Sequence, residues 1–211
     1  SGYDRERICV PQRCNCRRDT CRYRCFLDAC QSGKYAIQIC NHNLLLADLI
    51  HRSQKKKPIL PDGAVYIIDE AHKLPEAARQ MFGTTLTANE ITALSRSLHT
   101  ERYVLAAELL TEAAAPLMDK LSVPVEEGSG FDDYRLLLEK PHRILTVICH
   151  QLEGLLTKET WRQLTAVATA VTLFYEGNPE MVFYAADHDH GGAMLCATVA
   201  DLAGQLQKTL W

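Results

Sequence analysis

The chain has 211 residues, of which 47% are hydrophobic and 23% are charged, so it has room for one large domain or two small ones. No apolar run approaches the roughly 18–20 residues that span a bilayer, and this excludes a transmembrane protein. The net charge of −3 is uneven: residues 1–57 contain twelve Lys and Arg against five Asp and Glu, whereas residues 58–211 contain eleven against twenty-one. The basic quarter indicates a contact with a polyanion, although a solvated surface would have the same composition.

Six of the nine cysteines crowd into the basic N-terminal segment. They are Cys9, Cys14, Cys16, Cys21, Cys25 and Cys30. The segment is rich in Arg, poor in aliphatic residues and preceded by no secretory signal, so a metal site in a reducing cytoplasm is predicted rather than disulfides. Both a [4Fe–4S] cluster and Zn²⁺ take four thiolates, and the spacing alone does not choose between them.

The remaining cysteines, Cys40, Cys149 and Cys196, lie in apolar segments and are predicted to be buried thiols.

Two apolar runs in the first 83 residues predict strands, and two segments with capping signals predict helices. The expected elements are, in chain order, a strand end at 37–40, a helix at 44–50 capped by Asn43, a turn at 61–63, a buried strand at 65–68 and a short helix from Pro75 to Phe82.

From residue 84 onward the pattern becomes mainly helical. The expected elements are a helix begun by the capping-box pair Thr87 and Glu90, a helix at 101–121 bent near Pro116, a loop at 122–130, a helix at 132–156 interrupted at Pro141, and a helix from Thr157 that ends before Gly177. Two strands at 181–184 and 195–199 and a helix at 200–211 follow. The turn between those strands contains His188 and His190, which we interpret as a solvated hairpin tip rather than a metal site.

Asp69-Glu70-Ala71-His72 follows the predicted buried strand directly. Phosphate hydrolysis needs one carboxylate to hold Mg²⁺ and a second to orient the attacking water. An acidic pair at the carboxyl end of a parallel strand supplies both, because ligands bind at that edge of open α/β sheets. The string therefore predicts a phosphate-hydrolysing site, with an exposed acidic pair at a strand end as the alternative.

This string matches motif II of DEAH-type helicases, and residues 39–48 (ICNHNLLLAD) resemble the segment that follows the cysteine cluster in DinG/XPD-like iron–sulfur DNA helicases. The order of cysteines, Asn-His helix, acidic strand end and long helical insertion also resembles that family. The resemblance covers essentially the whole chain, most specifically residues 9–82.

The resemblance implies a mixed α/β, predominantly helical fold that includes part of a parallel-sheet helicase motor domain. The implied domains are an iron–sulfur domain at 1–36, part of motor domain 1 at 37–83, a helical Arch domain at 84–178, and a strand pair with a helix returning to the motor domain at 179–211.

The resemblance also implies roles for individual residues. Asp69 and Glu70 would bind Mg²⁺, Glu70 would activate water, and His72 would relay the nucleotide state. The implied cluster ligands are Cys9, Cys16, Cys21 and Cys25, with Cys14 and Cys30 as alternates. The implied contacts with single-stranded DNA are Arg17, Arg18, Arg22, Tyr23, Arg24 and Tyr35.

The sequence contains no G-x-x-x-x-G-K-[ST] phosphate loop, so we expect a central piece of a larger, monomeric, cytoplasmic helicase that carries half of an ATP site. The whole enzyme would translocate on single-stranded DNA and unwind forked duplex in repair or replication, with ATP, Mg²⁺ and a [4Fe–4S] cluster as cofactors. Two alternatives remain: a non-catalytic nucleic-acid-binding module stabilised by Zn²⁺, and a protein-interaction scaffold.

Overall fold

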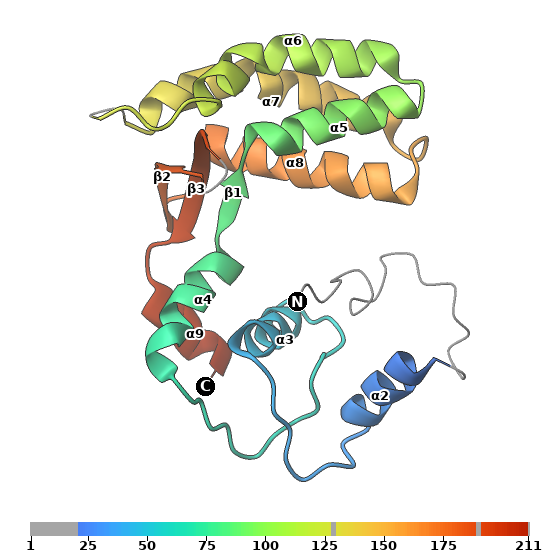
Figure 1. Cartoon of the computed structure of the whole chain (residues 1–211), viewed down its shortest axis with the longest axis vertical. Coiled ribbons are helices and arrows are strands. Elements are labelled where there is room, and N and C mark those ends of the chain that lie inside the picture. The colour runs from blue at the N-terminus through green and yellow to red at the C-terminus, as the bar shows by residue number, and fades with distance from the viewer. Residues whose placement is uncertain (1–20, 128–129, 189–190, 211) are drawn as a thin grey trace, which may run out of the picture. The chain divides into compact units, whose positions relative to one another are not determined.

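The computed structural model describes residues 21–127, 130–188 and 191–210. The chain divides into two compact units, one ending at Ala71 and the other beginning at His72 (Figure 1). The division into four domains that the sequence suggested is finer than this one, and it stays a prediction.

Within its described residues, the regular part of the first unit consists of α2 (Arg22–Gln31) and α3 (His42–Ser53). The N-cap of α3 is Asn41, whose side chain accepts a hydrogen bond from the N–H of Leu44 at 2.9 Å. The cap was predicted at Asn43, which instead lies inside the helix. Asn41 has the extended backbone that an N-cap needs, so its side-chain oxygen reaches the N–H three residues on.

The two strands predicted in this unit are absent from its described part, where residues 37–40 and 65–68 belong to no helix or strand. Their side chains are exposed, 95% for Ile39 and 92% for Ile67, where burial was expected. A strand needs a neighbour for its backbone N–H and C=O groups, and the described residues of this unit supply none. The mostly helical character of the predicted fold is confirmed, whereas its parallel sheet is not seen in the described residues.

The second unit is built mainly of helices. A short 3₁₀ helix, η1 (Ala71–Lys73), leads into it. Its elements are α4 (Leu74–Phe82), β1 (Thr84–Leu86), α5 (Ala88–Thr100), α6 (Val104–Leu121), α7 (Asp132–Leu152), α8 (Lys158–Glu176), β2 (Met181–Asp187), β3 (Ala193–Val199) and α9 (Leu202–Leu210).

Helices α5 to α8 run alongside one another and share one core with the small sheet at their end (Figure 1). The predicted capping box is present: the Thr87 side chain accepts the N–H of Glu90, and the Glu90 carboxylate accepts the N–H of Thr87. Each of the helices α5 to α8 buries one apolar face, with its buried residues mostly three or four positions apart. The largest fully buried side chains include Tyr134, Phe174, Leu94, Leu110, Leu138 and Leu145.

The interruption predicted at Pro141 is absent, since α7 continues through this residue. Helix α6 also contains its proline, Pro116, where a bend was predicted. A proline within a helix removes one backbone hydrogen bond at a cost of about 3 kcal/mol. Pro141 is itself buried, between Leu138 and Leu145 on the inner face of α7, and this packing offsets the lost bond.

The three strands form an antiparallel sheet in the order β1-β3-β2. The predicted hairpin is confirmed and is longer than expected, running from the pair Met181 and Val199 to the pair Asp187 and Ala193. At its tip the His188 N–H donates to the carbonyl of Gly192 at 2.8 Å, and His190 lies outside the described residues. Strand β1 was missed, because three residues are too few for an alternating pattern.

The three cysteines outside the N-terminal segment differ in burial. Cys196 is buried in β3 as predicted, Cys149 is half-buried, and Cys40 is exposed, so the prediction for Cys40 was wrong. Cys40 follows the run of residues that was expected to lie inside a sheet, and without that sheet its side chain meets solvent. Burial raises the pKa of the Cys196 and Cys149 thiols, which keeps both protonated near neutral pH.

A carboxylate at the end of α5 caps α8. Glu101 accepts hydrogen bonds from the Thr157 N–H at 3.0 Å and from the hydroxyls of Thr157 and Thr160. These bonds, led by that of the Thr157 hydroxyl, lower the pKa of Glu101 below its ordinary 4.5. The loop between α5 and α6 is thereby hydrogen-bonded to the start of α8, 56 residues further along the chain.

We expect Glu101→Gln to lower the free energy of unfolding of the second unit by about 1 kcal/mol at neutral pH, since solvent screens this exposed carboxylate. A depressed pKa means that the stabilisation is present above the ordinary Glu pKa and is lost as the pH falls toward the folded value. Urea unfolding of wild type and variant at decreasing pH should therefore show the difference shrinking below about pH 4.5. Glu108→Gln on α6 is the matched control, and an equal loss there would contradict the assignment.

Candidate functional site

The acidic pair of the Asp-Glu-Ala-His string lies at a turn that leads into η1 and α4. Both Asp69 and Glu70 are exposed, so their carboxylates reach solvent rather than the interior of a sheet. The N–H of Glu70 donates to Oδ1 of Asp69 at 2.9 Å, and Glu70 has a φ of 49°. His72, the fourth residue of the string, is exposed in η1. The structure thus places the two carboxylates on adjacent exposed residues at one turn, whereas the sequence predicted them at the carboxyl end of a buried strand.

Helix α3 holds this turn through His42. Nε2 of His42 lies 2.9 Å from the carbonyl oxygen of Asp69, and a carbonyl can only accept, so the ring nitrogen donates. No role was predicted for His42, although the string Asn41-His42 was part of the resemblance. The sequence signal that could have revealed it is a histidine on the first turn of a capped helix.

The same helix holds the loop before the turn through a buried carboxylate. Asp48 is 2% exposed and accepts hydrogen bonds from the N–H groups of Ile59 and Leu60, at 2.6 and 2.9 Å. Nε of Arg52 donates to its other oxygen at 2.7 Å. A buried carboxylate must be compensated in this way, because its transfer out of water is costly.

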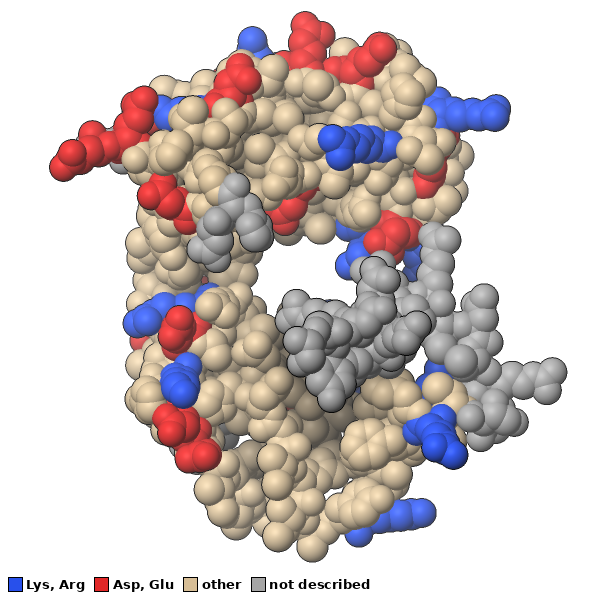
Figure 2. All heavy atoms as spheres, in the orientation of Figure 1, with Lys and Arg blue, Asp and Glu red and all other residues tan. Residues whose placement is uncertain are grey.

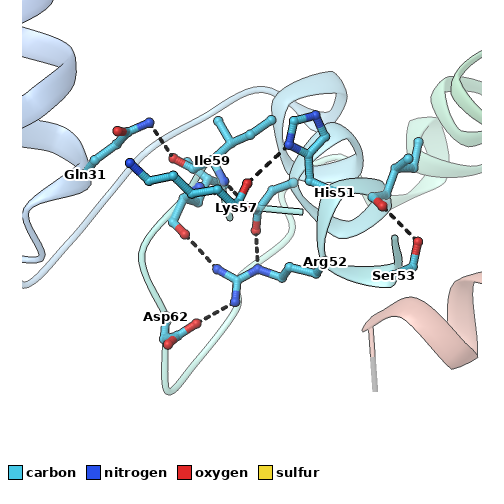
Figure 3. Close-up of polar contacts among 10 residues, drawn as sticks. Gln31, His51, Arg52, Ser53, Lys57, Ile59 and Asp62 are labelled. Carbon is cyan, nitrogen blue, oxygen red and sulfur yellow. Dashed lines mark hydrogen bonds and ion pairs between the residues drawn. The ribbon is translucent and has the colours of Figure 1, made fainter. Parts of the chain in front are cut away.

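Arg52 extends the network from Asp48 to the far side of the loop (Figure 3). Its two terminal nitrogens donate to Asp62 Oδ1 and to the carbonyl of Leu60, and its bonds to Asp48 and Asp62 raise its pKa. Nδ1 of His51 lies 3.2 Å from the Lys57 carbonyl, and Gln31 of α2 donates to the Ile59 carbonyl at 3.3 Å. Helix α3 and this loop therefore form one hydrogen-bonded body that sequence reasoning missed.

Three of the six clustered cysteines fall within the described residues, all of them on or beside α2. Cys21 is the N-cap residue, and the N–H of Cys25 bonds to its carbonyl at 2.9 Å, so these two residues stand one turn apart on one helix face. Cys30 lies five residues after Cys25 and therefore on a different face. Cys9, Cys14 and Cys16 lie outside the described residues, and within the described ranges no three His, Cys, Asp or Glu side chains come together as a metal site.

The donor set of α2 fits half of a four-thiolate site. Two thiols with one-turn spacing can ligate one metal centre, and Cys25 is exposed while Cys21 is half-buried. The geometry favours Cys21 and Cys25 as partners and disfavours Cys30. No residue of α2 is buried, so this helix does not contribute side chains to a hydrophobic core.

The predicted DNA contacts that can be placed also lie on or near α2. Arg22 and Tyr23 are exposed, Arg24 is half-buried, and Tyr35 is exposed beyond the helix, whereas Arg17 and Arg18 lie outside the described residues. Phe26, missed from the sequence, is 64% exposed one turn after Tyr23. Adjacent aromatic rings at this spacing offer faces on which bases could stack.

The helical part of the second unit is acidic, with thirteen Asp and Glu against eight Lys and Arg between residues 84 and 178. On the face shown in Figure 2, the acidic side chains are spread over the helices α5–α8. A groove of about 620 Å³ on this unit is lined by Asp132, Asp133, Arg135, Leu136, Glu139, Tyr175 and Glu176. Four carboxylates in one groove repel phosphate, so this groove does not suit a nucleic-acid backbone.

Part of the chain is distantly similar to ATP-dependent DNA helicases. It is 28% identical over 102 residues to the ATP-dependent DNA helicase YoaA of Escherichia coli (strain K12), a match that covers 44% of the chain and 16% of that relative. It is 34% identical over 61 residues to the ATP-dependent DNA helicase YoaA of Haemophilus influenzae (strain ATCC 51907 / DSM 11121 / KW20 / Rd), covering 29% of the chain and 10% of that relative. The matches therefore span less than a fifth of either relative's length.

No protein-family model matches the chain. Among the described residues, no helix is both long enough and apolar enough to cross a membrane.

The network around Asp48 leads to a test of the loop. We expect Asp48→Ala to speed amide exchange at Ile59 and Leu60 by about tenfold or more, because a hydrogen bond to a charged group contributes about 1.5–3 kcal/mol. Asp62→Ala removes the exposed partner of Arg52 and should change this exchange by much less. Amide exchange is measured by NMR on both variants. Equal rates at Ile59 and Leu60 in Asp48→Ala and wild type would contradict the role of Asp48 in holding the loop.

Proposed function

We propose that the chain is the central segment of an iron–sulfur, ATP-dependent DNA helicase of the DinG/XPD kind. The observation that carries the proposal is the exposed Asp69–Glu70 pair at a turn that opens a helix, within a chain partly similar to two ATP-dependent DNA helicases. The relatives' activity is extended to this chain as part of the proposal.

The proposed chemistry at the turn divides between two carboxylates. Asp69 would hold Mg²⁺, and Glu70 would orient and deprotonate the attacking water. Both groups are exposed, as residues that meet a nucleotide need to be. Mg²⁺ supplies charge stabilisation to the phosphates when it is bound. His72 would respond to the state of the nucleotide.

The rest of the ATP site would come from a longer protein. The sequence lacks a phosphate loop, and the backbone amides and Lys of that loop are what position a triphosphate. The exposed apolar residues at 37–40 and 65–68 are consistent with this proposal, because strands of a longer chain could pair with them and bury them. In that arrangement Asp69 and Glu70 would stand at the carboxyl end of a buried strand.

Helix α2 is proposed to carry cluster ligands on one side and to meet single-stranded or forked DNA with its Arg and aromatic residues. Arg22, Tyr23, Arg24 and Tyr35, together with Arg17 and Arg18, would contact phosphates and bases. We propose Cys9, Cys16, Cys21 and Cys25 as ligands of a [4Fe–4S] cluster. The acidic helical part of the second unit would be the Arch domain and would not take part in phosphate contacts.

Hydrolysis tests the function. We expect no ATP hydrolysis above background from the isolated chain, and DNA-stimulated hydrolysis from the intact protein that contains it. Glu70→Gln in the intact protein should keep ATP binding and lower kcat by about 100-fold or more, as loss of a general base does. Glu76→Gln, an exposed glutamate in the first turn of α4, is the matched control and should be as active as wild type. Hydrolysis by the isolated chain that Glu70→Gln abolishes would show that the site is complete without a longer protein.

Metal content tests the cluster. Anaerobically purified intact protein should contain about four iron and four sulfide per chain, and the iron should be lost in Cys21→Ser and Cys25→Ser but kept in Cys30→Ser. Iron loss should also leave residues 21–31 sensitive to protease, since metal binding supplies folding free energy. Stoichiometric zinc without iron would instead support the zinc-stabilised nucleic-acid-binding module.

A further inference from the structure

We propose that His42 is the positioning residue for the Asp69–Glu70 turn, an inference that rests on the proposed function of that turn. The carbonyl of Asp69 and the N–H of Glu70 belong to the same peptide group. The carbonyl accepts from Nε2 of His42 at 2.9 Å, and the N–H donates to Oδ1 of Asp69 at 2.9 Å. Both polar atoms of this one peptide group are thus bonded, which fixes its orientation.

The backbone at this point requires such a restraint. Glu70 has a φ of 49°, in the left-handed region that residues with a Cβ atom rarely adopt. A residue in this conformation persists only where its surroundings hold it, and such residues concentrate at functional sites. The two bonds on the preceding peptide group are the restraint that the structure shows. Without them the turn can relax, and the direction of the Glu70 side chain changes with it.

The two bonds are not equivalent. The Asp69 carboxylate is the group proposed to hold Mg²⁺, so the acceptor of the Glu70 N–H is shared with the metal. The bond from His42 to the carbonyl involves neither carboxylate. His42 is therefore the contact able to keep the turn in place when the carboxylates are engaged.

Hydrogen bonds between α3 and the loop at residues 59–62 fix the helix that carries His42. Six residues further along the same helix, Asp48 binds the N–H groups of Ile59 and Leu60 at 2.6 and 2.9 Å. Helix α3 therefore holds the segment between Leu60 and Asp69 at both ends, with Asp48 and Arg52 at its start and His42 at its finish. A displacement of α3 along its axis would carry the Asp69 carbonyl with it.

The test compares His42→Ala, which removes the donor, with His42→Gln, whose side-chain amide places an N–H at a similar reach. His51→Ala is the matched control, because it removes a second histidine-to-carbonyl contact of α3, at Lys57, away from the turn. Amide exchange at residues 69–71 is measured on the chain itself. The kcat and KM for ATP hydrolysis with DNA are measured on the intact protein that contains it.

We expect His42→Ala to speed exchange at Glu70 and to lower kcat by about tenfold, the effect of one lost hydrogen bond of good geometry, with KM within about twofold. His42→Gln should restore most of both, and His51→Ala should change neither. Wild-type exchange or wild-type kcat in His42→Ala overturns the inference, as does an equal loss in His51→Ala. A wild-type intact protein without DNA-stimulated hydrolysis overturns the proposed function instead, and the exchange result then still decides whether His42 holds the turn.

Discussion

A single buried carboxylate organises the described part of the first unit. Asp48 is 2% exposed, and burial of a charge is tolerated only where its oxygens find donors. Two backbone N–H groups and one guanidinium nitrogen meet this requirement, and all three must converge on one helical position. The requirement fixes the loop from residue 59 to residue 62 against α3. Few apolar side chains are available to do this, since the residues that follow the loop are exposed.

Helices were predicted well because their signals are local. The Thr87–Glu90 capping box, the helix start at Thr157 and the apolar spacing of the later helices all depend on a few neighbouring residues, and each appears in the structure. Asn41 and Asn43 show the limit of this reasoning. Two equivalent capping residues stood two positions apart, and only the backbone conformation distinguishes them.

Strands were predicted less well because pairing depends on residues far away in the chain. The apolar run at 65–68 has the composition of a buried strand, yet its first three side chains are exposed in the structure and Ile68 is half-buried. The hairpin of β2 and β3 succeeded because its partners are neighbours in sequence. In the candidate site, the acidic pair was expected at the end of a paired strand and stands instead at an exposed turn of the described residues, because that pairing too depends on distant parts of the chain. His42 was missed because its partner is a backbone carbonyl, which no side-chain motif reveals. Asp48 and Arg52 form an ion pair one helical turn apart that their spacing could have indicated, whereas the bonds of Asp48 to Ile59 and Leu60 involve backbone atoms.

The short strand β1 has a consequence for how the helical unit can vary. Thr84 pairs with Ala197 and Leu86 with Leu195, so the chain enters and leaves this region at neighbouring positions although more than one hundred residues lie between them. The segment 87–194, which contains the helices α5 to α8, is thus a closed excursion, because the strands that flank it are joined by backbone hydrogen bonds. Such an excursion can gain or lose helical turns, or acquire a different surface, without displacing the chain on either side of it. The helices would then be free to diverge while α4 and the turn before it keep their local structure.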